Sequence, residues 1–320
     1  MVSLALGVDL GGTNARAAVV DRDSGEIVAA HKEPLHARDP AAVVEVVAHA
    51  VREATEAQGV AAGSFRSVGV GVAGQCLGAT GMVLNAPNLG WRDVPFGALL
   101  SERLGVRVRI VNDLSAAAWG EKRFGAAQGL SEVVLVFVGS GVGSGLILGG
   151  RLHEGARGIG GELGHVKVRP ARASTPVRRC GCGMMGCLEA YASGVNIAAR
   201  VREELAAGIS SRVLELAGGD PARITASVVD AAWGEGDGYA RALWGEVAEL
   251  LGTSIANVAT LLNPERIILG GGVVLGCPHL VRLALEQLDE KVLVAARQGL
   301  SVERAFLGDD AGVIGAALLE

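Results

Sequence analysis

A glycine-rich turn between two apolar segments occurs twice in this chain, roughly 130 residues apart. The first turn, Asp9-Leu-Gly-Gly-Thr-Asn14, joins residues 4–8 to residues 15–20. The second, at residues 139–145, joins residues 133–138 to residues 146–148. Each pattern predicts two strands joined by a glycine turn. The spacing is too long for a solenoid repeat, so we expect two domains of related construction.

Between and after these turns, strand patterns alternate with helix patterns. Further strands are predicted at residues 67–72, 106–111, 266–269 and 302–307. Helices are predicted from Asp39-Pro40 onward, where the aspartate caps and the proline opens the helix, around residues 116–119, and at residues 239–262 and 311–319. The alternation places the chain in the α/β class, and 320 residues are enough for two domains.

Charge and composition argue against two classes of partner. A net charge of −5 offers no basic surface for nucleic acid or an anionic membrane, and 3% aromatic residues are too few for a base-stacking surface. No apolar run is long enough to span a bilayer. The first residues run straight into a strand pattern without a signal peptide. We therefore expect a cytoplasmic protein without nucleic-acid or membrane partners.

A cluster of cysteines indicates a metal site. Three of the five cysteines fall within eight residues, and a histidine precedes them; the candidate ligands are His165, Cys180, Cys182 and Cys187. One imidazole and three thiolates match a closed tetrahedral zinc site, and the intervening glycines permit the tight turn. A cytosolic compartment disfavours a disulfide, although structural thiols or a disulfide remain the alternative. Cys76 and Cys277 are expected to be ordinary residues.

The first glycine turn has the features of a phosphate-binding loop. Gly11 and Gly12 leave room for backbone N–H groups to approach phosphate oxygens, while Thr13 adds a hydroxyl and Arg16 a charge. Asp9 could hold magnesium through water. A tight hairpin capped by Asp9 is the alternative. Together with the second turn, the pair could clamp a triphosphate from both sides. Neither turn has the Walker or Rossmann pattern.

Asp113 is the candidate general base. It follows an apolar strand at the opening of a helix, and ligands of α/β sheets bind at the carboxyl ends of strands. Phosphoryl transfer to a hydroxyl needs a carboxylate that orients the hydroxyl and accepts its proton. A helix N-cap is an equally good interpretation of the residue from the sequence alone.

Other polar groups suit a sugar. Glu162 and Glu189 could accept hydroxyl hydrogens, and a metal-bound His165 has its second nitrogen free to donate; support of the metal alone is the alternative. Asn85 and Asn88 offer amides in a loop, or plain turn chemistry. The glycines at 270–272 suit close approach of a flat ring such as adenine, or a turn.

In combination, these motifs resemble the ROK family of sugar kinases and related repressors. The resemblance comprises the segment from Asp9 to Arg16, the second glycine turn, Asn112-Asp113, Gly-Glu-Leu-Gly-His165, the Cys-x-Cys-x₄-Cys-Leu-Glu189 cluster, the glycines at 270–272 and the terminal Ala-Gly-Val-Ile-Gly-Ala-Ala. It covers almost the whole chain. It implies a two-domain actin/hexokinase-like (ribonuclease H-like) fold with an interdomain cleft. Residues 1–118 plus 308–320 would form the smaller domain, and residues 119–307 the larger, zinc-carrying one.

The resemblance also implies an activity: ATP-dependent phosphorylation of a hexose at O6, with glucose as the first candidate and a place in glycolysis. Asp113 would be the catalytic base, zinc would be structural, and Mg²⁺ would accompany ATP. The sugar would be held by Gly74, Asn88, Asn112, Asp113, Glu162, His165 and Glu189. The nucleotide would be held by Asp9, Gly11, Gly12, Thr13, Arg16, Ser140, Gly141, Gly143, Gly271 and Gly272.

Several alternatives stay open within the resemblance. The acceptor could be N-acetylglucosamine, N-acetylmannosamine or fructose, and the donor could be polyphosphate. A sugar-sensing repressor is the alternative of another class; such relatives carry a helix-turn-helix before the kinase-like part, and here the first glycine turn begins within ten residues of the start. A homodimer is the family expectation.

Overall fold

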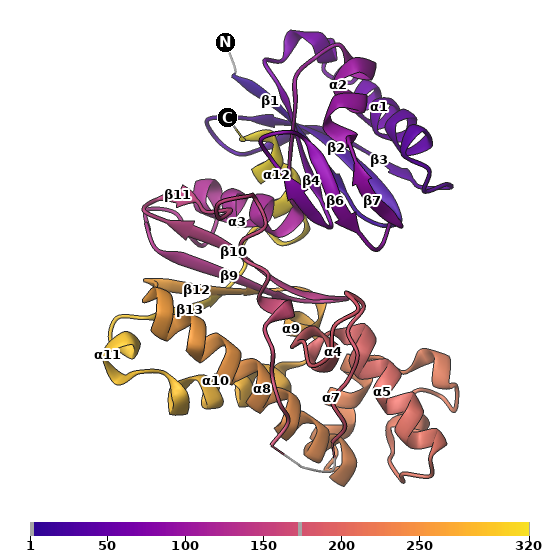
Figure 1. Ribbon diagram of the computed structural model, residues 1–320, viewed down its shortest axis with the longest axis vertical. Helices are drawn as coiled ribbons and strands as arrows, with labels where there is room; N and C mark the ends of the chain where they lie inside the picture. The colour runs from indigo at the N-terminus through magenta and orange to yellow at the C-terminus, as the bar shows by residue number, and fades with distance from the viewer. Residues whose placement is uncertain (1–2, 172–174, 320) are drawn as a thin grey trace. The chain divides into compact units, whose positions relative to one another are not determined.

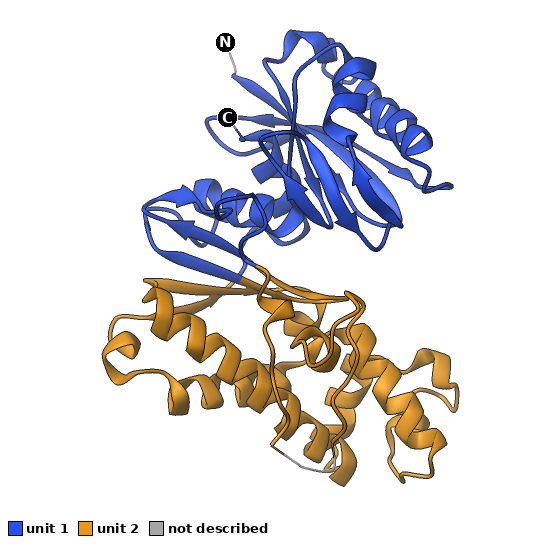
Figure 2. Ribbon diagram, in the orientation of Figure 1, with its two compact units in different colours: residues 1–135, 145–161, 305–320 blue, residues 136–144, 162–304 orange. Residues whose placement is uncertain are grey.

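The computed structural model describes residues 3–171 and 175–319. The outermost residues of the predicted smaller domain, 1–2 and 320, lie outside the described part. Contacts between Cα atoms divide the chain into two compact units (Figure 2). Unit 1 comprises residues 1–135, 145–161 and 305–320, and unit 2 comprises residues 136–144 and 162–304. The predicted domain boundaries stay a prediction.

Unit 1 is built on a five-stranded sheet of order β3-β2-β1-β4-β8 (Figure 1). Its strands are β1 (Leu4–Leu10), β2 (Asn14–Asp21), β3 (Ile27–Pro34), β4 (Val68–Val72) and β8 (Val108–Asn112). A small sheet adds β5 (Gln75–Leu77), β6 (Met82–Ala86) and β7 (Trp91–Val94). The helices are α1 (Pro40–Glu56), α2 (Phe96–Leu104), α3 (Asp113–Phe124) and α12 (Ala311–Ala317).

The register of the parallel strands aligns their carboxyl ends. β1 and β4 pair Leu10 with Val72, and β4 and β8 pair Val72 with Asn112. The chain therefore leaves β1, β4 and β8 at the same edge of the sheet. In open α/β sheets this edge is where ligands bind.

α12 packs closely on the sheet because β1 and β4 present glycines to it. A Cβ added at Gly7 would lie 2.3 Å from the Val313 carbonyl oxygen, and one added at Gly69 would lie 1.9 Å from that of Ala316. Both distances are too short for any side chain, so the strands need glycine there. In the terminal motif itself, a Cβ added at Gly315 would lie 1.7 Å from the Ala116 carbonyl oxygen, so its small residues serve close packing, as the sequence predicts.

A second five-stranded sheet has the order β11-β10-β9-β12-β13. Its strands are β9 (Val133–Val138), β10 (Val142–Leu148), β11 (Arg151–Leu152), β12 (Arg266–Gly270) and β13 (Ser301–Arg304). The helices of unit 2 are α4 (Glu189–Ala192), α5 (Gly194–Ala206), α6 (Val213–Leu216), α7 (Ala226–Gly234), α8 (Gly238–Leu262), α9 (Gly272–Gly276), α10 (Pro278–Lys291) and α11 (Val294–Arg297). α8 and α10 run side by side (Figure 1).

Most predicted elements are confirmed, and three need correction. β10 already begins at Val142, so the second glycine turn is shorter than residues 139–145, and Gly143 lies in a strand. The last strand ends at Arg304 instead of 307, and the last helix ends at Ala317 instead of 319. The last strand, β13, pairs with β12 only from Ser301 to Arg304. Hydropathy alone does not reveal where this pairing stops. Among the described residues, no helix is long and apolar enough to cross a membrane.

Candidate functional site

The first glycine turn, residues 11–13, is held against the loop that carries Asn88. The turn is closed by a hydrogen bond from the Gly11 amide to the Asn14 carbonyl, 3.0 Å long. A Cβ added at Gly12 would lie only 2.7 Å from the Asn88 Cβ, so this position requires glycine. The Asn88 residue itself is exposed. Two predicted site residues, one for phosphate and one for sugar, therefore lie in contact.

Asp9 and Arg16 face each other across β1 and β2, where the ladder pairs them. Burial raises the pKa of the Asp9 carboxyl, and the charge of Arg16 opposes that shift. Arg16 also has partners that the sequence did not indicate: its Nη1 lies 2.6 Å from Asp310 Oδ1 and 3.4 Å from the Asp309 carbonyl oxygen. The predicted phosphate-binding charge is therefore already paired with an acid beside α12.

The sequence left open whether Asp113 is a general base or the N-cap of a helix, and the structure gives the N-cap to its neighbour Asn112. Asn112 is the N-cap of α3, because its Oδ1 accepts hydrogen bonds from the Leu114 and Ser115 amides at 2.9 and 3.2 Å. Its Nδ2 donates to the Gly74 carbonyl at 3.0 Å, which ties the ends of β8 and β4 together. Asp113 is the first residue of α3 and accepts from the Leu114 amide at 3.0 Å.

Gly71 and Gly74 make room at this edge. A Cβ at Gly71 would lie 3.4 Å from the Asp113 Cα, and one at Gly74 would lie 2.6 Å from the Asn85 carbonyl oxygen. The start of α3 and the small sheet can therefore approach the end of β4 closely. Asp9 is the second-last residue of β1, and Gly74 and Asp113 follow the ends of β4 and β8 at the same edge.

The second glycine turn, residues 139–141, is held by a carboxylate. Glu189 Oε2 accepts a hydrogen bond from the Val142 amide at 3.0 Å, and a Cβ at Gly141 would lie 2.8 Å from the same oxygen. The Gly139 amide closes the turn on the Gly141 carbonyl at 2.9 Å. Ser140 is exposed at the tip.

Gly271 and Gly272 lie beside this turn. Gly271 has a φ of 95°, and a Cβ there would lie 2.4 Å from the Val138 carbonyl oxygen, so both its conformation and its surroundings require glycine. A Cβ at Gly139 would lie 3.7 Å from the Gly272 nitrogen. The two predicted nucleotide-binding segments of unit 2 are thus neighbours.

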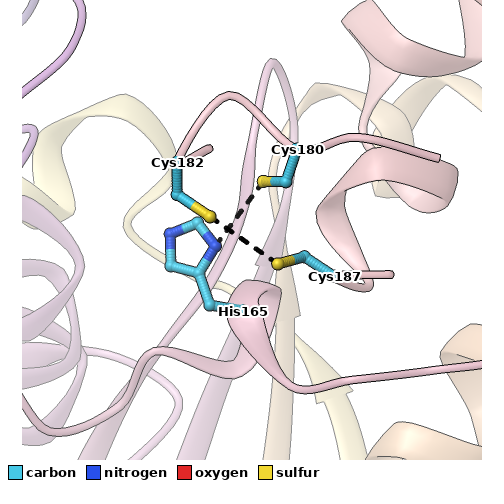
Figure 3. A group of neighbouring side chains, drawn as sticks. All are labelled: His165, Cys180, Cys182 and Cys187. Atoms are coloured by element: carbon cyan, nitrogen blue, oxygen red, sulfur yellow. Dashed lines mark hydrogen bonds between the residues drawn. The ribbon is translucent and has the colours of Figure 1, made fainter. Parts of the chain in front are cut away.

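The four predicted metal ligands converge (Figure 3). One ligand atom from each of His165, Cys180, Cys182 and Cys187 lies within 4.8 Å of all the others. Cys182 Sγ and Cys187 Sγ are 3.7 Å apart, and Cys180 Sγ is 3.8 Å from His165 Nδ1. A tetrahedral site with zinc–sulfur bonds of about 2.3 Å has edges of about 3.8 Å. The donor set and its spacing therefore fit zinc.

Glu189 connects the metal cluster to the second glycine turn. Its Oε2 binds the Val142 amide, while its Oε1 lies 3.6 Å from Cys180 Sγ. His165 directs Nδ1 toward Cys180 and has Nε2 3.8 Å from Glu162 Oε2. Burial raises the pKa of the Glu162 carboxyl, and His165 opposes that shift.

Lys167 is a residue that the sequence reasoning missed. Its Nζ lies 2.8 Å from Cys187 Sγ, and an isolated β-bridge pairs the two residues. Three thiolates and a divalent ion leave one excess negative charge, which a lysine at this distance offsets. The sequence did not single it out, because Arg169 follows two residues later and its partner Cys187 is 20 residues away.

The predicted site residues thus form two groups, one in each unit. Unit 1 gathers Asp9, Gly11, Gly12, Thr13, Arg16, Gly74, Asn88, Asn112 and Asp113 at one edge of its sheet. Unit 2 gathers Ser140, Gly141, Gly143, Glu162, Glu189, Gly271, Gly272 and the four metal ligands.

Comparison with known proteins shows similarity over the whole chain. A glucokinase of Streptomyces coelicolor is 34% identical over 99% of this chain and 97% of its own length. The crystal structure of a Streptomyces griseus glucokinase of the ROK family, in complex with glucose and AMPPNP, is 34% identical with a TM-score of 0.80, and the match covers 98% of both chains. A transcriptional regulator described as a homolog of the E. coli MLC protein is 28% identical with a TM-score of 0.82, over 98% of this chain and 77% of the regulator.

These similarities confirm the predicted α/β fold of actin/hexokinase type. Residues 5–320 match the family profile, which leaves no large part of the chain unexplained. The chain belongs to the ROK family.

Proposed function

We propose that this protein is a glucokinase that transfers the γ-phosphoryl group of ATP to O6 of glucose. The observation that carries the proposal is the position of Asp113, a carboxylate at the carboxyl edge of the unit 1 sheet, where the glycine turn after β1 also lies. Full-length similarity to glucokinases, one of them solved with glucose and AMPPNP, supports the same activity.

Asp113 is the proposed general base. Its carboxylate accepts the proton of the O6 hydroxyl as the bond from oxygen to the γ-phosphorus forms and the bond to the leaving ADP oxygen breaks. Asn112 is a positioning residue, because its amide is engaged with the α3 amides and the Gly74 carbonyl. Asn112 therefore fixes the point at which α3 begins and with it the Asp113 backbone.

The glycine turns are the proposed phosphate-binding segments. In unit 1 the Gly11 amide closes the turn on the Asn14 carbonyl, and Gly12 and Thr13 would offer an amide and a hydroxyl to phosphate. In unit 2 Ser140 and Gly141 would do so. Arg16, held by Asp310, keeps positive charge beside Asp9. Mg²⁺ bound with ATP would neutralise charge on the phosphate oxygens, and Asp9 would hold it through water. Gly271 and Gly272 would face the adenine.

Sugar hydroxyls are the proposed partners of Asn88, Glu162, His165 and Glu189. Zinc held by His165 and the three cysteines is structural, because four protein ligands leave no open position. His165 would hold the ion through Nδ1, which lies 3.8 Å from Cys180 Sγ, so Nε2 would remain to donate to a hydroxyl. Glu189 orients the second glycine turn and the cluster at the same time.

The remaining expectations are part of the proposal. We propose a cytoplasmic homodimer that acts in glucose catabolism, without nucleic-acid or membrane partners. N-acetylglucosamine, N-acetylmannosamine and fructose are the competing acceptors, and polyphosphate is the competing donor. Steady-state rates of the purified protein with each acceptor and donor separate these options. Turnover itself separates an enzyme from a sugar-sensing regulator.

The decisive experiment replaces Asp113 by asparagine. Asp113→Asn preserves side-chain size but removes the base, so kcat should fall by about 10²–10⁴-fold while glucose binding measured by calorimetry stays within a few-fold. Asp23→Asn, an exposed aspartate of the same unit, is the control and should retain the wild-type rate. A kcat close to wild type in Asp113→Asn would remove Asp113 from the mechanism.

A further inference from the structure

A second group of potential metal ligands lies in unit 1, on β3 and α1. We propose that His31, Glu33 and His49 form a binding site for a divalent transition-metal ion such as Zn²⁺. One ligand atom from each residue lies within 4.8 Å of the other two. None of the three belongs to the proposed sugar, nucleotide or Cys₃His sites.

The three residues converge because of the local fold. His31 and Glu33 are two positions apart on β3, the edge strand, so their side chains emerge on the same face. The alternation of burial along β3 shows that this face is the half-buried one, and α1 packs against the strand. His49 belongs to α1. The site therefore joins an edge strand to the helix that covers it.

The distances suit coordination of one ion. His31 Nε2 is 2.8 Å and His49 Nδ1 is 3.3 Å from the same Glu33 oxygen, Oε2. Metal–ligand bonds of about 2.1 Å place neighbouring ligand atoms about 3.0 Å apart at octahedral angles and about 3.4 Å apart at tetrahedral angles. Only small side-chain rotations are needed to admit an ion among these atoms.

His49 supplies an independent observation. Within the described part of the chain, its Nδ1 is a buried atom without a hydrogen bond of good geometry, and its polar neighbour Glu33 Oε2 lies at 3.3 Å. Buried polar atoms are rarely left unsatisfied, and each such case needs an explanation. A metal ion bound to this nitrogen supplies one.

The other nitrogen of His49 faces a carboxylate at slightly more than hydrogen-bond distance. Nε2 lies 3.6 Å from Glu53 Oε1, one helical turn further along α1. Metal-binding histidines usually direct their second nitrogen to a carboxylate or carbonyl, which orients the ring. Arg52 is also 3.6 Å from the same Glu53 oxygen, so positive charge next to the site is already paired.

The donor set defines the class of ion. Two imidazoles and one carboxylate favour Zn²⁺, Ni²⁺, Cu²⁺ or Fe²⁺ over Mg²⁺ and Ca²⁺, which prefer oxygen ligands. The side chains of His31, Glu33 and His49 are 34%, 28% and 42% exposed. The cluster therefore lies near the surface, although His49 Nδ1 itself is buried, and water would complete the coordination. Such a site is weaker than the closed Cys₃His site and exchanges its metal.

Zinc stoichiometry tests the proposal. Intact protein is first dialysed with a weak chelator that removes loosely bound ions, then titrated with Zn²⁺ by calorimetry, with metal content measured by mass spectrometry. Wild type should bind one more equivalent than Glu33→Gln or His49→Gln, or bind it at least about tenfold more tightly. The same Zn²⁺ should raise the melting temperature of wild type and leave that of both variants unchanged.

The control is His36→Gln, which removes an exposed histidine shortly after β3 and should bind zinc as wild type does. Circular dichroism and sugar-kinase turnover of the variants, expected to equal wild type, show that they are folded. Equal zinc stoichiometry and affinity in wild type, Glu33→Gln and His49→Gln would overturn the proposal. Because the comparison is between these chains, its outcome does not depend on the proposed catalytic function.

Discussion

The two glycine turns share a pattern in the sequence but differ in what holds them. The turn in unit 1 is held by van der Waals packing, since a Cβ added at Gly12 would lie 2.7 Å from the Asn88 Cβ. The turn in unit 2 is held by a carboxylate: Glu189 Oε2 accepts a hydrogen bond from the Val142 amide at 3.0 Å. The other oxygen of the same carboxylate lies 3.6 Å from Cys180 Sγ. One turn is positioned by packing, whereas the other is linked through Glu189 to the proposed zinc ligands.

Two turns with similar sequences can therefore be held by different interactions. A packed turn responds mainly to changes in side-chain volume. A turn held by a carboxylate that also contacts metal ligands responds to charge and metal content. Perturbations that affect one turn and spare the other therefore test the distinction.

The largest effect is expected from loss of the metal. Cys187→Ser or removal of zinc by a strong chelator should destabilise unit 2 by on the order of 4 kcal/mol or more, because the thiolates lose the ion that holds them together. Hydrogen exchange should accelerate at the Val142 amide and stay unchanged at the Gly11 amide. Cys277→Ser, at a thiol outside the cluster, is the control for chelation: it should respond as wild type does. Equal acceleration at both turns would contradict the distinction.

A smaller effect is expected from Glu189→Gln. The amide keeps the shape of the side chain but loses the charge that strengthens the bond to Val142, which should cost about 1–3 kcal/mol of stability. KM for ATP should rise as the second turn loosens. Thermal unfolding and steady-state kinetics measure both changes. Glu215→Gln, an exposed acid of unit 2, should change neither.

In unit 1 the matching perturbation is Gly12→Ala. The added methyl group collides with Asn88, so we expect a loss of about 1–3 kcal/mol together with a raised KM for ATP, independent of zinc content. Gly63→Ala, where nothing lies within 4 Å of the added carbon, is the matched control. A zinc-dependent defect in Gly12→Ala would show that the turns are not held independently.

The smallest effect is expected from a substitution in α8, which changes the stability of unit 2 without touching the second glycine turn. Gly245 is exposed in the middle of α8, and an added Cβ there meets nothing within 4 Å. Gly245→Ala should stabilise the protein by about 0.5–1 kcal/mol and leave kinetics unchanged. If unit 2 stability alone governed the second turn, this variant would lower KM for ATP.

Residue patterns sufficed for much of this architecture. The α/β alternation, the limits of α8 at Leu262 and the convergence of His165 with three cysteines were all predictable, since each depends on local periodicity or on a ligand set with one chemical purpose. The partners of Arg16 and Lys167 were not, because pairing across 293 residues or across a β-bridge leaves no local signal. The role of Asn112 as helix cap was decided only by hydrogen-bond geometry.

The close packing of α12 on β1 and β4 has a consequence for synthesis. The helix supplies Val313, Ile314 and Ala317 to a cluster that also contains Ala5 and Val20 from the first two strands. The ribosome makes those strands first and their covering helix only after all of residues 162–304. Unit 1 therefore holds an uncovered apolar sheet face throughout translation of unit 2, and this is the stage at which a nascent chain would need a chaperone.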